Sequence, residues 1–169
     1  QQIHLLHRIP FLWHFHKIHH SVQREEMDWI VSFRFSWVES VLYKTLCYLP
    51  LAWFGFDPAA IFVHAVFGTL IGHPNHADLS WDYGPLRYVL NSPRMHHQHH
   101  DYYVHNRNFG IIFSCWDWCF GTAHLDAQPP ERLGFPNDTQ IPTNLWAQLV
   151  WPLPLVSPKA PAWLWSGFG

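Results

Sequence analysis

The chain has 169 residues with a formal net charge of −2, and 13% of its residues are charged against 49% that are hydrophobic. This length predicts one domain with room for a core, and the lack of a basic stripe in the sequence argues against nucleic-acid binding. Aromatic residues reach 18%, with 11 Trp, which argues against a disordered chain and favours either a membrane protein or an unusually apolar core.

The first 20 residues predict a helix that is interrupted near Pro10, because proline fits the first turn of a helix better than its interior. Residues 11–21 are therefore the expected continuous helix. His16, His19 and His20 follow the spacing H-x-x-H-H, which places three imidazoles on one helix face. A polar loop is expected at residues 21–28.

Two apolar runs come next, and the turn signal at residues 55–58 separates them. The run 29–54 is interrupted by Arg34, Glu39 and Lys44, and the run 59–72 contains His64. Neither run offers the roughly 20 apolar residues of a plain transmembrane helix. Together they predict a helical hairpin that enters or spans a bilayer with its polar residues inward or at the interface. A hairpin buried in a soluble bundle is the alternative.

The second H-x-x-H-H spacing lies at His96, His99 and His100, after the segment 73–78 that is expected to end the hairpin. A short apolar helix is expected at residues 111–120, with Gly121 as its C-terminal cap. Beyond residue 122 the chain is rich in proline. Its stretch 145–165 also carries several tryptophans, and we expect this stretch to lie along an interface rather than to form a spanning helix.

The two triplets supply more imidazole nitrogens than one four-coordinate ion can take, so the sequence predicts a histidine-rich site for two metal ions. Further ligands are expected from two histidine pairs at i, i+3 spacing. The candidate ligands are His4, His7, His16, His19, His20, His73, His76, His96, His99 and His100. Carboxylates expected to orient their rings are Glu39, Asp78, Asp101 and Asp117.

The remaining histidines are expected elsewhere. His14 and His97 point away from their triplets, His64 lies too deep in the hairpin to reach the metals, and the default position for His105 and His124 is the surface. The chain lacks the E-x-x-H pairs of soluble di-iron bundles and the H-E-x-x-H hydrolase motif. A zinc site at Cys115, Cys119 and His124 is an alternative, but cysteines among Trp and Phe are more often core residues. All-imidazole sites suit iron, zinc, copper or nickel, so the metal stays open at this point.

From His4 to about Thr122 the chain resembles the fatty acid hydroxylase / sterol desaturase superfamily of membrane di-iron enzymes. The resemblance rests on LWHFHKIHHS at 12–21, YGPL at 83–86, SPRMHHQHH at 92–100, NFG at 108–110, and on Trp116, Asp117, Phe120, Gly121 and Thr122. It implies an all-α, membrane-embedded helical bundle with a histidine-rich di-metal site at the cytosolic helix ends. Residues 1–125 would form an N-terminally truncated catalytic domain, and 126–169 a Pro/Trp-rich C-terminal tail.

The same resemblance implies that the six triplet histidines are metal ligands and that His76 matches an intervening family histidine. Two stretches depart from the family pattern. The first family motif is H-x-x-x-H, but Ile3 stands four residues before His7, and His4 gives H-x-x-H instead. The family stretch R-x-H-P-x-E keeps Arg34 and Glu39 here, but Ser36 and Trp37 replace its central residues.

The function implied by the resemblance is O2-dependent oxidation of an unactivated C–H bond in a lipid or sterol, by hydroxylation or desaturation. Its cofactors would be two Fe ions, with Zn possible in purified protein, and O2. Electrons would come from an external cytochrome b5 or ferredoxin-type donor, since the chain shows no flavin or nicotinamide fingerprint. The expected location is a bacterial inner membrane or the endoplasmic reticulum. A non-catalytic histidine-rich metal-binding or transport protein, or an inactive homologue, is the alternative.

Overall fold

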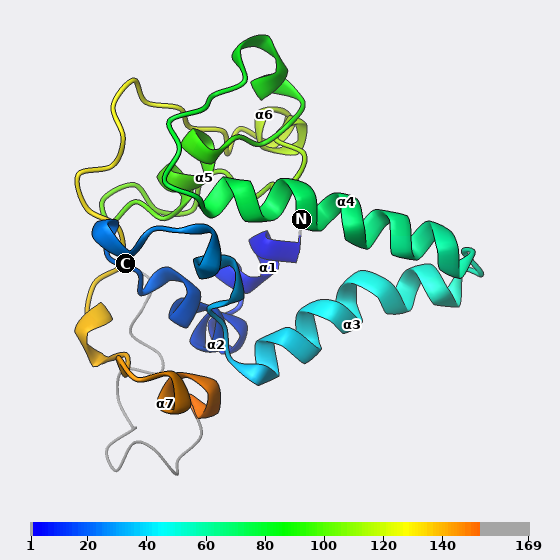
Figure 1. Ribbon diagram of the computed structural model, residues 1–169, viewed down its shortest axis with the longest axis horizontal. Helices are drawn as coiled ribbons and strands as arrows, with labels where there is room; N and C mark the ends of the chain where they lie inside the picture. The colour runs from blue at the N-terminus through cyan, green and yellow to red at the C-terminus, as the bar shows by residue number, and fades with distance from the viewer. Residues whose placement is uncertain (1, 153–169) are drawn as a thin grey trace.

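The computed structural model describes residues 2–152, which form helices joined by irregular segments (Figure 1). The α-helices are α1 (Gln2–Arg8), α2 (Pro10–His20), α3 (Trp37–Trp53), α4 (Pro58–His76), α5 (Pro93–His99), α6 (Cys115–Phe120) and α7 (Leu145–Val150). Short 3-10 helices lie at Arg24–Glu26, Trp29–Phe33, Gly84–Tyr88 and Asp138–Gln140. Within the described range there is no β-strand, only an isolated antiparallel bridge between Asp101 and Leu133. The predicted all-α class is confirmed for this range.

Helices α1 and α2 meet at the expected proline. Ile9 is extended and Pro10 occupies the first turn of α2, where a missing N–H costs no intrahelical hydrogen bond. From His14 onward every residue of α2 is buried. The break lets α1 turn and pack against α2. This packing brings residues of α1 beside the first triplet.

Helices α3 and α4 form the predicted hairpin, which extends away from the rest of the molecule (Figure 1). Gly55 takes a positive φ of 75° in the turn, and the Asp57 carboxylate accepts a hydrogen bond from Ala59 N at 2.7 Å to cap α4. By length and hydropathy, none of the helices between residues 2 and 152 qualifies as a membrane span.

The segment 73–78 ends the hairpin as expected, and within it helix α4 continues through Pro74 to His76. Proline removes one backbone donor, and the final turn is held by other contacts. Ala77 N donates to Pro74 O at 3.0 Å, and Asn75 Nδ2 donates to Ile111 O at 2.8 Å. The extension carries His76 on a rigid helix into the centre of the molecule.

Helix α6 is shorter than the predicted 111–120 and begins at Cys115. The backbone just before the predicted helix is held by the buried Asp117 carboxylate. This carboxylate accepts hydrogen bonds from Phe109 N and Gly110 N, both at 2.8 Å. Thr122 Oγ1 donates to the same carboxylate at 2.6 Å. Gly121 caps the helix in the left-handed region as predicted, with φ at 70°.

The described part of the C-terminal segment packs on the triplet helices. Ile18 of α2 is fully buried against Phe135, Ile141 and Trp151. Gly134 N donates to His100 O at 3.0 Å, directly after α5. Residues 126–152 thus cover the side of α2 and α5 that faces away from the hairpin. The predicted interfacial stretch 145–165 falls largely outside the described residues.

We expect Asp117→Asn to destabilise the fold by about 2–4 kcal/mol, because a buried carboxylate with three donors loses charge-assisted hydrogen bonds. The measurement is thermal and denaturant unfolding followed by tryptophan fluorescence. Asp126→Asn is the matched control, since Asp126 is exposed and should change stability by about 0.5 kcal/mol or less. Equal effects of the two substitutions would contradict the assignment of Asp117 as the anchor of the 108–114 segment.

Candidate metal centre

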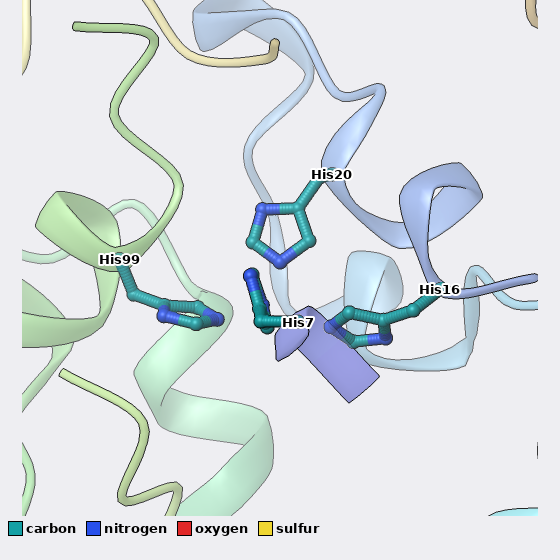
Figure 2. A group of neighbouring side chains, drawn as sticks. All are labelled: His7, His16, His20 and His99. Atoms are coloured by element: carbon teal, nitrogen blue, oxygen red, sulfur yellow. The ribbon is translucent and has the colours of Figure 1, made fainter. Parts of the chain in front are cut away.

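Eight histidines form two groups of four buried side chains. The first group is His7, His16, His20 and His99, and the second is His19, His76, His96 and His100. Within each group one ring nitrogen per residue lies within 4.8 Å of the others. Figure 2 shows the first group, whose rings come from α1, α2 and α5 and turn toward a common centre. Convergence of the two triplets, which the sequence predicted, is therefore observed.

The two triplets interleave, whereas the sequence suggested that each could aim at one point. His16 and His20, the i, i+4 pair of α2, belong to the first group. His96 of α5 and His100, the cap of that helix, belong to the second. The remaining residues, His19 and His99, cross to the other group. Helical geometry explains this division, because residues i and i+4 lie about 40° apart around the axis, whereas i+3 lies about 60° to the other side.

In the first group, the atoms that converge are those left without partners. His7 Nε2, His16 Nε2, His20 Nε2 and His99 Nε2 are all buried and have no hydrogen-bond partner among the described residues. His16 Nδ1 donates to Glu39 Oε1 at 2.6 Å, and His99 Nδ1 donates to the Arg107 carbonyl at 2.6 Å. A proton on Nδ1 leaves the Nε2 lone pair free toward the centre of the group.

In the second group, the Nε2 atoms are close enough together to bind one metal ion. His76 Nε2 lies 3.0 Å from His19 Nε2 and 2.8 Å from His96 Nε2, and His100 Nε2 lies 3.2 Å from His96 Nε2. Metal–nitrogen bonds of 2.0–2.1 Å place neighbouring ligand nitrogens about 3.0–3.4 Å apart. His76 Nδ1 donates to the Gly72 carbonyl at 2.8 Å, which again leaves Nε2 as the ligand atom. Both groups therefore fit a metal ion.

Burial favours the neutral form of several of these rings, which is the form that binds metals. Desolvation lowers the pKa of His7, His19, His20, His96 and His100 well below 6.5, and neighbouring imidazoles lower it further. Desolvation also lowers the pKa of His99, to about 4. Eight adjacent imidazolium ions would repel one another. The arrangement therefore favours neutral rings that bind a metal cation through their lone pairs over rings that carry an extra proton.

Aromatic side chains close the first group on two sides. The Phe109 ring lies 5.3 Å from that of His7 and 5.9 Å from that of His99, and Trp13 lies 5.0 Å from His7. Phe109 belongs to the backbone segment that Asp117 holds in place. These contacts exclude water and fix the ring orientations.

Two of the ten candidate ligands lie outside both groups. His4 accepts a hydrogen bond from Arg8 at 3.2 Å and packs on Phe109, 4.6 Å between ring centroids. His73 bonds to Ser32 and stacks on Phe33, with ring centroids 4.6 Å apart. The altered first motif therefore contributes His7 alone to the groups.

Of the four candidate carboxylates, Glu39 is the one that forms a hydrogen bond with an imidazole of either group. Asp117 bonds to backbone N–H groups and to Thr122, and Asp101 accepts from Tyr103 N at 2.6 Å. Asp78 is exposed beside His97. Backbone carbonyls of Gly72 and Arg107 take the role expected of carboxylates. No sequence pattern identifies a carbonyl acceptor, so these partners emerge only from the fold.

Of the other histidines, His105 is exposed as expected, whereas His14 is buried against Trp151 and His124 is half-buried rather than on the surface. His97 Nε2 bonds to the Ala77 carbonyl at 2.9 Å, away from both groups. In the described range, Cys115 and Cys119 are free thiols and belong to no candidate metal group.

A pocket of about 180 Å³ begins at the histidine groups and runs between α3 and α4. Its walls include His16, His19 and His76 near the centre, and Tyr48 and His64 further along the hairpin. Glu39 lines it as well, and its Oε2 atom is buried without a hydrogen-bond partner in the described chain. The pocket connects the candidate metal centre to the hairpin.

Residues 3–122 match the family model described as fatty acid hydroxylase. Ornithine lipid hydroxylase OlsE of Rhizobium tropici is 32% identical over 129 residues, which cover 74% of this chain and 38% of that protein. Alkylglycerol monooxygenase of Homo sapiens is 31% identical over 158 residues, covering 85% of this chain and 35% of that protein. The alkylglycerol monooxygenase of Xenopus tropicalis is 30% identical over 120 residues, covering 70% and 26%.

The chain thus spans about a quarter to two fifths of the length of these relatives. No solved structure matches it. The matched region contains all eight clustered histidines and agrees with the motifs found in the sequence. The chain therefore belongs to the fatty acid hydroxylase family.

Proposed function

We propose that this chain forms the catalytic part of an oxidoreductase that uses O2 and two iron ions to hydroxylate an unactivated C–H bond in the alkyl chain of a lipid. The observation that carries the proposal is the pair of buried four-histidine groups, with the four Nε2 atoms of the first group unpartnered. The relatives with 30–32% identity are named for lipid hydroxylation and alkylglycerol oxidation, which favours hydroxylation over desaturation.

The side chains would divide the work as follows. His7, His16, His20 and His99 hold one ion, and His19, His76, His96 and His100 hold the other. When bound, the two ions supply the reduction of O2 and the removal of a hydrogen atom from the substrate carbon. Glu39 orients His16 and raises its basicity as a ligand. Phe109 and Trp13 keep water from the first group, and the pocket wall positions the alkyl chain beside the second.

The proposed substrate is an unbranched alkyl chain. The pocket is smaller than the about 300–1,000 Å³ of sites that enclose a whole drug-sized ligand, so it holds a segment of a lipid. It extends along α4 from His76 to His64, which are 12 positions apart and about 18 Å apart along the helix at 1.5 Å per residue. A pocket of this volume that runs along the hairpin suits an extended hydrocarbon chain.

We further propose that the α3–α4 hairpin is immersed in lipid. Its surface carries exposed large apolar side chains, with Trp53 83% and Phe54 79% exposed at the turn and Leu49, Phe62 and Leu70 along the helices. Monomeric soluble proteins rarely expose so much contiguous apolar surface. Electrons would come from an external donor, of the cytochrome b5 or ferredoxin type, on the side of the molecule away from the hairpin.

His76→Ala should lower the iron content of the full chain from about two ions to one or fewer and abolish lipid hydroxylation, since His76 Nε2 lies in the second group. His64→Ala should leave the iron content at the wild-type value, because His64 is about 18 Å away along α4. The measurement is metal analysis after anaerobic reconstitution with Fe(II). Equal metal loss from both substitutions would contradict the placement of the site. One loosely held ion in the wild type would favour a metal-binding or transport protein.

Glu39→Gln should weaken the binding of one of the two ions by about 10–100-fold, because the His16 ring loses the carboxylate that fixes its tautomer. A chelator titration that follows both ions separately measures this change. Asp101→Asn is the control, since Asp101 bonds to backbone N–H groups and not to an imidazole. Weakening of both ions to the same extent in Glu39→Gln would argue for a general loss of structure instead.

The double substitution of Trp53 and Phe54 by Glu should reduce binding to phosphatidylcholine vesicles by about tenfold or more, because two charges replace aromatic rings at the hairpin turn. Vesicle flotation measures the bound fraction. Trp116→Glu on α6, which is 49% exposed but outside the hairpin, serves as the control. If the control lowers binding as strongly, the hairpin is not the lipid-facing surface.

A further inference from the structure

Lys44 is an isolated charge on an apolar hairpin. Between residues 40 and 76 the formally charged side chains are Lys44 and Asp57. Asp57 has a structural role as the cap of α4. Lys44 forms no ion pair with any residue in the range 2–152, and its ammonium lies 5.9 and 5.6 Å from the ring centroids of Tyr43 and Tyr48. A charge kept on such a surface is costly, so its presence indicates a function.

Exposure of the pocket lining shows which end is open. At the metal end His16, His19, Glu39 and His76 are buried. At the other end the lining residues Lys44 and His64 are exposed. The mouth of the pocket therefore lies at Lys44 and His64, and its closed end lies at the two histidine groups. A ligand that reaches the metal centre by this path enters with its apolar end first and leaves its polar end at the mouth.

Apolar residues of α4 and of the segment before α6 line the middle of the pocket. Gly68 and Gly72 of α4 face the segment before α6, and a Cβ atom at Gly68 would lie 3.3 Å from Ile112 Cδ1. A Cβ atom at Gly72 would lie 3.7 Å from Ile111 Cγ1. Asn75 fixes this wall by its hydrogen bond to the Ile111 carbonyl. Helix α4 therefore packs closely on Ile111 and Ile112, and an alkyl chain in the pocket would lie beside this wall.

We propose that Lys44 binds the anionic headgroup of an amphiphile whose alkyl chain lies in this pocket, a carboxylate or a phosphate ester held at the mouth. This inference rests on the proposed function and specifies its substrate class.

Three features of the mouth support an anion. Lys44 is its cation, while the lining carboxylate, Glu39, lies at the closed end and is engaged with His16. Tyr48 and His64 stand beside Lys44, with ring centroids 6.2 Å apart at 88°, and both can donate hydrogen bonds to an anionic oxygen. The apolar surroundings reduce screening of the ammonium charge, which strengthens its attraction for an anion.

The position of the headgroup also determines which carbon is oxidised. With the anion fixed at Lys44 and the chain extended toward His76, the distance along the pocket sets the chain position that meets the metal centre. Specificity then depends on the separation between headgroup and reacting carbon, which is a property of the hairpin and not of the histidine groups.

The test compares binding of hexadecanoate, hexadecyl phosphate and hexadecanol to the metal-loaded full chain in neutral detergent, by displacement of a fluorescent fatty-acid probe. We expect at least one of the two anions to bind about tenfold or more tightly than the alcohol. Lys44→Met should remove this preference without changing the affinity for hexadecanol, and Lys44→Arg should retain it. The anion that shows the larger preference identifies the headgroup as carboxylate or phosphate.

Arg8→Met is the charge-matched control, since it removes one positive charge outside the pocket and should preserve the preference for the anion. Equal binding of the anions and the alcohol to the wild type would overturn the proposal. So would a Lys44→Met variant that weakens all three ligands alike, or that changes none of them.

Gly68→Leu provides the second measurement. It should weaken binding of all three ligands while the iron content stays at the wild-type value, because leucine at Gly68 must displace Ile112 in the pocket wall, away from the histidines. Undiminished binding in Gly68→Leu would show that the ligand does not enter this pocket. Metal content and turnover report on the proposed function separately, since anion binding that depends on Lys44 would be observed even if the loaded chain hydroxylated no lipid.

Discussion

The burial of eight imidazoles is the constraint on which the rest of the structure depends. In the described part of the chain, buried polar side chains outnumber buried hydrophobic ones, with 22 against 12. Each buried nitrogen without a partner costs about 1–3 kcal/mol, and four such Nε2 atoms meet in the first group. That cost is comparable with the about 5–15 kcal/mol of net stability of a typical domain. In the proposed function, metal ligation would therefore stabilise the fold as well as equip it for chemistry.

Glu39 couples the hairpin to this centre. It is the residue of α3 that reaches α2, and its contact with His16 at 2.6 Å is buried at both ends. The same side chain lines the pocket with its unpartnered Oε2 atom. A ligand that enters between α3 and α4 thus meets the group that orients a metal ligand. Ser36 caps α3 by accepting from Glu39 N at 3.2 Å, which fixes where the carboxylate leaves the helix. Ser36 departs from the family pattern, and its role as the cap of α3 explains why a serine fits at that position.

Periodicity predicted the elements well where local signals were strong. Pro10, Pro58 and Gly121 mark helix boundaries that the structure reproduces, and the H-x-x-H-H spacing predicted convergent rings. It could not predict which ring joins which group, because that depends on how α2 and α5 face each other. Nor could it distinguish His7 from His4, or anticipate that α4 continues through Pro74, since tertiary contacts of Asn75 and His76 hold that turn. The short α6 is accompanied by a tertiary contact that periodicity does not reveal, the hydrogen bond from Phe109 N to Asp117 just before the predicted helix.

Interleaving of the triplets has a consequence for assembly. Each group takes rings from both α2 and α5, with His7 added to one and His76 to the other. Neither helix can complete a site alone, and α1 and α4 must also be docked before four nitrogens meet. Rings of the two groups are in contact, since His20 stacks on His100 with centroids 4.3 Å apart. Displacing one helix would therefore disturb both groups together. If two ions bind as proposed, the first would order helices that supply the second, and the two sites would be coupled through shared helices rather than through a shared ligand.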